Sequence, residues 1–455
     1  MIRPKEEKVG PGQLQLASQL RLLGVSARYA QGRLQGLILT HGWYFLIFSF
    51  LMRLPAAMIM LTVMMMLALQ QGNLALAGYG AGTVGLAAAL VLPAYLALAE
   101  RWGVRRSYFA LTLVNILALV WLMFESLRFE TQSGSVASFI AAAALAGLTT
   151  LPLGALMRRY WSQEYLAFQD RRKLNASFSL ETIFDVTALP AGATIAGVST
   201  LIFTGPTTLF VILLIDALGL LMLLWRPENL PAEEDMETRA QKARPQPKPL
   251  QGTARFLLYF PQLGSICLGL FLGATQAALL AFALSTDQMH TSGYLIGLLG
   301  FCAVLSSLFV LFAHLPMFGW AAWLMSGISL LLMSLLSSLP DSTLGMIPVL
   351  TGLGLAFGLC LVTMDSIATS LSARKNLDLA LATLQASYLG GIALGLVWAA
   401  AVSESYSYQV ALMIPLLAAA LFFGLGHLYG FFWRQNYEES LAPLPLAERR
   451  ARPKA

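Results

Sequence analysis

Arg53, Glu181 and Asp185 are charged residues that lie inside long apolar stretches of the sequence. Arg53 follows Trp43 by ten residues and Asp185 follows Ala176 by nine, which places both roughly 15 Å along a helix that rises 1.5 Å per residue. An uncompensated charge at that depth in a bilayer costs on the order of 3 kcal/mol or more. We therefore treat the three residues as functional candidates.

Glu181 and Asp185 are four residues apart, so they share one face of a helix. Two carboxylates at this spacing repel each other in a low dielectric unless a cation or a proton intervenes. Arg53 is the natural cation, and a carboxylate that holds a proton would act as a proton carrier. The trio is either a proton-coupling network or a purely structural ion pair that clamps two helices, and the sequence leaves both interpretations open.

Helices that cross a bilayer are needed to hold these residues near its middle. The sequence contains twelve apolar segments, most of them with the roughly 17–25 residues that cross about 30 Å of hydrocarbon. We predict an all-α polytopic membrane protein with twelve transmembrane helices in two six-helix bundles. The predicted spans are Trp43–Leu69, Gly78–Ala99, Tyr108–Phe124, Val136–Met157, Ala176–Val198, Thr208–Trp225, Phe260–Leu284, Gly293–Ala313, Phe318–Leu336, Thr343–Ala368, Leu379–Val402 and Tyr408–Trp433.

The composition excludes a soluble protein. Hydrophobic residues make up 57% of the chain and charged residues 11%, with a mean hydropathy of +0.69, whereas about a quarter of a soluble domain is charged. The net charge of +6 is spread along the predicted membrane edges. Contact with anionic lipid headgroups therefore explains it, and no nucleic-acid partner is expected.

The basic residues predict the orientation in the membrane. Of the 29 Lys and Arg residues, all but Arg53 and Arg128 lie in the two tails or on alternate connections. Basic residues near span ends favour the cytoplasmic side, so we expect a multi-pass protein of the plasma (inner) membrane with both termini in the cytoplasm. The polar N-terminal tail lacks the form of a cleavable signal, and it is either a helix on the membrane surface or disordered.

The chain divides into five parts. A charged, proline-containing stretch between the sixth and seventh spans predicts a flexible linker. The expected parts are an N-terminal tail (1–41), an N-terminal six-helix bundle (42–225), a cytoplasmic linker (226–255), a C-terminal six-helix bundle (256–433) and a cytoplasmic C-terminal tail (434–455).

The connection after the second span carries a recognisable motif. Residues 96–106 read Leu-Ala-Leu-Ala-Glu-Arg-Trp-Gly-Val-Arg-Arg, which resembles the Gly-x-x-x-Asp-Arg-x-Gly-x-Arg-Arg loop motif of the major facilitator superfamily. A leucine stands where the motif begins with glycine. The resemblance implies a charge relay that holds one conformation closed, and ordinary flanking charge is the alternative. The corresponding residues are Glu100, Arg101, Gly103, Arg105 and Arg106.

A second run, Leu-Pro-Ala-Gly-Ala at residues 189–193, is similar to the glycine-rich fifth span of drug-proton antiporters. The residues around it resemble actinobacterial efflux-like permeases of the same superfamily. The resemblance implies that the tenth span borders a substrate cavity, where Asp365 is a candidate. It implies that the sixth span, with Asp216, is peripheral. The polar residues that we place in the C-terminal half of the cavity are Gln276, Gln385 and Tyr388.

Motifs of enzymes and metal sites are absent from the sequence. It contains no HExxH, GxSxG or Walker loop, and its three cysteines have no CxxC spacing. We expect no enzymatic activity, no cofactor and no metal. Any active transport would then be driven by an ion gradient or by the gradient of the substrate.

Taken with the resemblance, these features predict a secondary active transporter that exports small amphiphilic compounds by alternating access, coupled to protons. We expect a monomer whose partners are a small-molecule substrate, protons and the lipid bilayer. Two alternatives are a permease for uptake of a nutrient or metabolite and a transport-inactive membrane scaffold.

Overall fold

The computed structural model describes residues 42–130, 134–151, 153–154, 156–158, 160–161, 171–202, 207–225, 252–286, 291–313, 319–372 and 377–441. All regular secondary structure in these ranges is helical. The predicted N-terminal tail lies outside the described residues, as do most of the linker and of the C-terminal tail.

Ten of the described helices are long and apolar enough to cross a membrane, and two shorter apolar helices, Val136–Leu148 and Thr208–Leu221, accompany them. The chain is a multi-pass membrane protein. The first half of the chain forms α2 (Trp43–Leu51), α3 (Leu54–Gln71), α4 (Leu74–Trp102), α5 (Val104–Glu130), α6 (Val136–Leu148), α8 (Arg171–Ile202) and α9 (Thr207–Trp225).

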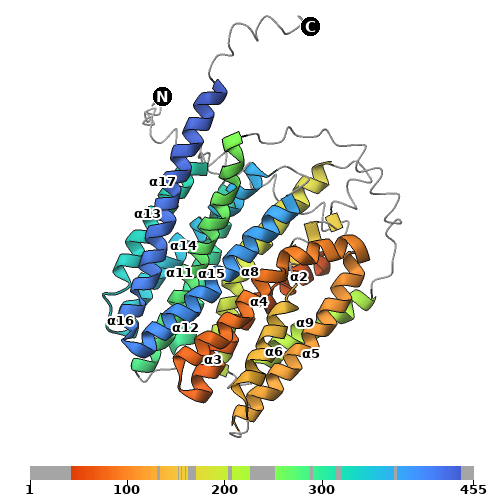
Figure 1. Cartoon of the computed structure of the whole chain (residues 1–455), viewed down its shortest axis with the longest axis vertical. Coiled ribbons are helices and arrows are strands. Elements are labelled where there is room, and N and C mark those ends of the chain that lie inside the picture. The colour runs from red at the N-terminus through yellow and green to blue at the C-terminus, as the bar shows by residue number, and fades with distance from the viewer. Residues whose placement is uncertain are drawn as a thin grey trace, which may run out of the picture.

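The second half begins with a 3-10 helix, η1 (Gly252–Tyr259). It continues with α11 (Phe260–Ser285), α12 (Thr291–Ala313), α13 (Gly319–Leu336), α14 (Thr343–Leu371), α15 (Leu377–Ser405), α16 (Tyr408–Ala411) and α17 (Met413–Leu441). Helices of the two halves gather on opposite sides in Figure 1, with α4, α8, α12 and α15 between them. The last helix extends beyond its predicted end at Trp433.

The first predicted span is broken rather than continuous. It separates into α2 and α3 at Met52 and Arg53, because Pro55 has no N–H and its ring would clash with the carbonyl of residue 51 in a regular helix. Pro261 likewise lies in the first turn of a helix, whereas Pro190 lies inside α8.

The fourth predicted span also ends early, at Leu148 instead of Met157. Pro152 follows four residues later in the sequence, so it cannot donate to the Leu148 carbonyl. The Tyr95 hydroxyl of α4 donates to that carbonyl instead. The loss of a helical hydrogen bond is thereby compensated by a neighbouring helix.

The two halves approach each other through small residues. A Cβ placed on Gly78 of α4 would lie 2.9 Å from the Leu396 carbonyl oxygen of α15, and one on Gly300 of α12 would lie 2.5 Å from the Pro190 oxygen of α8. Thr194 of α8 donates to the Gly297 carbonyl of α12 at 3.1 Å. Close backbone approach of this kind gives membrane helices their packing contacts where no hydrophobic effect is available.

The leucine at the start of the loop motif takes part in the same contact. Leu96 of α4 is buried against Ala382 of α15. The small side chain that the motif has on one helix is therefore supplied here by the opposite helix, and the two halves still meet at this point.

Candidate functional site

The break between α2 and α3 places Arg53 at the centre of a polar site. The Arg53 backbone N–H donates to the Phe50 carbonyl at 3.0 Å, which leaves the Ser49 carbonyl without its helical donor. Arg53 Nη1 donates to that carbonyl at 2.6 Å and to the Ser49 hydroxyl at 2.9 Å. The Arg53 side chain thus supplies the donor that the Ser49 carbonyl lacks at the helix break next to Pro55.

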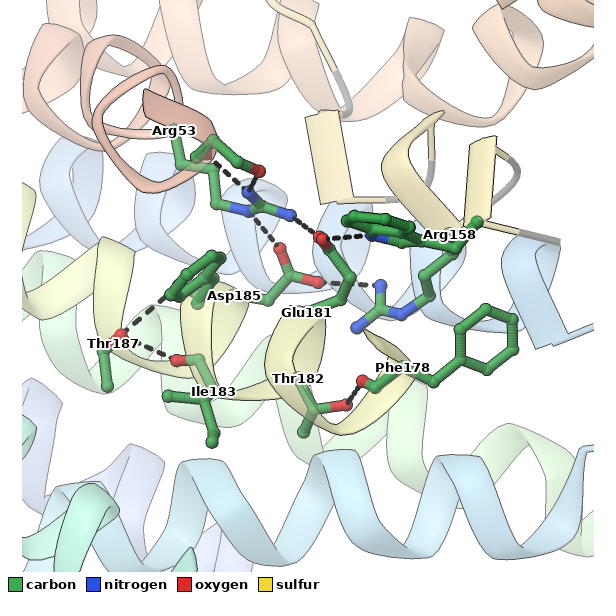
Figure 2. Close-up of polar contacts among 11 residues, drawn as sticks. Arg53, Arg158, Phe178, Glu181, Thr182, Ile183, Asp185 and Thr187 are labelled. Carbon is green, nitrogen blue, oxygen red and sulfur yellow. Dashed lines mark hydrogen bonds and ion pairs between the residues drawn. The ribbon is translucent and has the colours of Figure 1, made fainter. Parts of the chain in front are cut away.

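Both carboxylates of α8 reach the same guanidinium, as Figure 2 shows. Arg53 Nε donates to Asp185 Oδ1 at 2.9 Å, and Arg53 Nη2 forms an ion pair with Glu181 Oε2. Arg53 is 6% exposed, so these charges are compensated inside the protein. The structure therefore brings together the three charged residues that the sequence places at similar depth.

Two further residues complete the site, and sequence reasoning missed them. Arg158 Nη1 pairs with Asp185 Oδ2 at 2.7 Å, and the indole N–H of Trp161 donates to Glu181 Oε1 at 2.7 Å. The distribution of basic residues predicts Arg158 on a cytoplasmic connection, whereas the structure buries it to 2% exposure. Its position directly after an apolar segment was the only signal in the sequence.

Gly154 allows Asp185 to occupy its place. A Cβ on Gly154 would lie 2.6 Å from Asp185 Cγ and still closer to both carboxylate oxygens, a separation that real side chains do not show. Only glycine leaves room for the Asp185 carboxylate between Arg53 and Arg158. The sequence offered no signal for this contact, because the two residues lie on different segments.

The two carboxylates differ in their access to open space. The Glu181 side chain is fully buried, whereas that of Asp185 is 19% exposed. Asp185 and Arg53 line a cavity of about 20 Å³, room for about one water molecule. The other lining residues are Ala56, Ala57, Leu151, Leu153, Gly154, Ala188, Gln385 and Leu389. Asp185 is therefore the more accessible carboxylate of the pair.

Of the residues predicted to line the cavity from the C-terminal half, the structure places some at the cavity and others elsewhere. Gln385 of α15 lines the cavity beside Asp185. Tyr388 and Gln276 are buried in α15 and α11 and are not among the residues that line it. Tyr388 instead packs against Phe357 of α14, with 6.5 Å between the ring centroids.

Asp365 approaches the site from the other half of the chain. It is buried in α14, and the charges of Arg158 and Asp185 act on it. Asp216 is buried in α9, where its charge acts on Tyr108 of α5. Asp365 thus belongs to the surroundings of the Arg53 site, whereas Asp216 does not line its cavity.

Comparison with solved structures identifies the fold. The chain resembles the human organic anion transporter MFSD10 (TETRAN), with a TM-score of 0.62 and 16% sequence identity over 84% of this chain and 98% of that one. It is also similar to the nucleoside transporter NupG, with a TM-score of 0.60 and 14% identity over 85% of this chain and 98% of that one. This chain has the major facilitator fold. No protein-family model and no curated protein matches the sequence.

The resemblance inferred from the layout and the loop motif is thereby confirmed at the level of the major facilitator fold. Within the motif, Gly103 ends α4 with a φ of 83°, a left-handed conformation that favours glycine. Arg101 and Arg106 are exposed. The side chains of Glu100 and Arg105 lie outside the described residues, so the predicted charge relay stays a prediction.

Proposed function

We propose that this protein is a secondary transporter that exports small amphiphilic compounds in exchange for protons. Transport would proceed by alternating access between the two six-helix halves, residues 42–225 and 256–433. The major facilitator fold supports this proposal, since the two solved proteins it resembles are transporters of organic anions and of nucleosides.

The observation that carries the proposal is the position of Asp185. Its carboxylate lies on the wall of a cavity whose remaining surface is mostly alanine and leucine, and both of its oxygens are held by guanidinium groups. The apolar wall suits the apolar body of an amphiphile, while the carboxylate attracts either a proton or the cationic group of a ligand. If the proton and the substrate compete for this one carboxylate, one is released when the other binds, and the two are exchanged.

The small size of the cavity indicates that the helices must move before a substrate can bind. Its volume of about 20 Å³ is far below the roughly 300–1,000 Å³ of a typical ligand pocket. An amphiphile can therefore enter only when the helices around Asp185 separate. Because the cavity is lined by residues of α3 and α8 from the first half of the chain and of α15 from the second half, this separation would be a movement of one half against the other.

In the proposed topology the chain crosses the plasma membrane twelve times, so both termini lie in the cytoplasm. Cysteines introduced at Arg244 and at Ser133, in a background without Cys267, Cys302 and Cys360, should then react with an impermeant maleimide from opposite sides of the membrane. Labelling of intact and of opened cells measures this. Reaction of both positions from the outside would contradict the twelve-span topology.

Transport is tested with purified protein in liposomes under an imposed pH gradient. We expect wild-type protein to accumulate ethidium, a cationic amphiphile, and Asp185→Asn to lose this accumulation by at least about tenfold, since the carrier of the proton is gone. Asp216→Asn is the matched control, because it removes a buried carboxylate outside the site, and it should transport like wild type.

Other substrates in the same assay separate the alternatives. Saturable flux of a nucleoside or of an organic anion, with no flux of ethidium or of a neutral amphiphile, would contradict export of amphiphiles. A complete lack of saturable flux and of saturable binding would instead support a membrane scaffold.

A further inference from the structure

We propose that Glu404 is a latch that holds the two halves of the protein together at the end where α4 begins. The backbone N–H of Leu74, the first residue of α4 in the first half, donates to Glu404 Oε2 of α15 in the second half at 2.9 Å. In the proposed topology this end of α4 faces outward, so the latch keeps the outer entrance closed. The inference deepens the proposed function and rests on its alternation between states open to opposite sides.

The helices α4 and α15 continue to pair beyond the latch, and they lie side by side in Figure 1. One turn into α4, a Cβ on Gly78 would lie 2.5 Å from the Cβ of Ala400, which is one turn before Glu404. Near the other end of the two helices, Leu96 packs against Ala382. Each step forward along α4 is thus matched by an equal step back along α15. The two helices are antiparallel, and the latch lies at one end of their pairing.

Small residues make the contacts next to the latch. The Val397 side chain fills the place where Gly82 would carry a Cβ, and a Cβ on Gly85 would lie 2.8 Å from that of Ala393. Backbones that meet at glycines gain dispersion contacts, which have no charge and no bond direction. The hydrogen bond of Glu404 adds both a charge and a direction at the end of this apolar contact.

The position of Glu404 within its own helix is unfavourable. It lies in the last turn of α15, which ends at Ser405, and no basic residue accompanies it there. The C-terminus of a helix carries a partial negative charge that repels a carboxylate, whereas the N-terminus carries a partial positive charge that attracts one. The start of α4 therefore compensates Glu404 only while the halves are together at this end. Separation removes that compensation, so Glu404 favours the closed state.

The first turn of α4 forms without help from Glu404. Asn73 is the N-cap, and its side chain accepts from the Leu76 backbone N–H at 2.8 Å, while its carbonyl accepts from the Ala77 N–H at 3.2 Å. Glu404 is exposed, so the Leu74 N–H can donate to water once the carboxylate is gone. Loss of Glu404 should therefore shift the balance between the states of the protein and leave α4 folded.

The reactivity of a cysteine placed in the pairing measures how often this end opens. Val397→Cys, in the background without native cysteines, puts a smaller side chain against Gly82 of α4. Purified full-length protein in lipid nanodiscs is treated with a water-soluble maleimide, and the initial labelling rate reports the open fraction. We expect Glu404→Ala to raise this rate about threefold or more, as for the loss of a helix cap. Glu404→Gln keeps an acceptor without the charge, so its rate should rise less.

Asp341→Asn is the matched control. Asp341 is an exposed acid in the connection between α13 and α14, and its charge acts on Tyr408, which follows α15. It has no bond to the first half of the chain among the described residues, so its removal should leave the labelling rate unchanged. A wild-type rate in Glu404→Ala, or an equal rise in Asp341→Asn, would overturn the proposal.

A second cysteine separates a latch from general loosening of the protein. Ala382→Cys lies against Leu96, far from the latch along the pairing, and its labelling should not rise in Glu404→Ala, since a latch favours closure only at its own end. An increase at both cysteines would contradict the latch. Labelling needs neither substrate nor gradient. A lack of ethidium transport would therefore count against the proposed function, while the labelling rates still decide the role of Glu404.

Discussion

Arg53→Ala is expected to lower the free energy of unfolding by about 3–5 kcal/mol, the usual loss when one member of a buried ion pair is removed. The substitution leaves the fully buried Glu181 with the Trp161 indole in place of a bonded cation. It also leaves the Ser49 carbonyl without a donor at the helix break. Thermal unfolding of the purified protein in detergent measures the loss.

A second substitution should restore stability to different extents, depending on which carboxylate is neutralised. Asp185 keeps Arg158 as a partner when Arg53 is removed, whereas Glu181 has no other bonded cation among the described residues. Arg53→Ala with Glu181→Gln should therefore recover more stability than Arg53→Ala with Asp185→Asn. Equal recovery in the two double variants would show that the carboxylates are not distinguished by Arg158.

Gly154→Ala should lower transport driven by a pH gradient by about tenfold or more, since displacements of about 1 Å at a reacting group cost this much or more in rate. The new methyl group would overlap the Asp185 carboxylate and would push it away from one of its two arginines. Flux into liposomes and thermal unfolding measured together should show that transport suffers much more than stability.

Gly424→Ala is the matched control for this variant. It adds the same methyl group within α17, where no atom lies within 4 Å of the new Cβ, and it should transport like wild type. A Gly154→Ala variant with normal driven transport would mean that the place of Asp185 between the arginines is not needed.

Much of the fold could be predicted because apolar length alone locates a membrane helix. The segments that begin at Thr343 and Val136 start at those residues in the structure. The errors fall where a local residue overrides composition. Pro152 and Pro55 interrupt segments that remain apolar on both sides, and neither interruption changes the average hydropathy that the prediction used.

The charged centre of the site could be predicted in part. The spacing of Glu181 and Asp185 and the depth of Arg53 are properties of single helices, which a sequence reveals. The contributions of Arg158 and Gly154 depend on how a short segment after α6 packs against α8. Such contacts join residues that are distant in the chain, and no periodicity in one sequence encodes them.

The guanidinium of Arg53 bonds to the backbone at a helix break as well as balancing charge. Nη1 serves the backbone of α2, while Nε and Nη2 serve two side chains of α8. Lysine carries a single nitrogen on a flexible stem and has no fork to hold three partners in fixed directions. The break between α2 and α3 and the two carboxylates of α8 thus share one side chain, whose three nitrogens lysine could not replace.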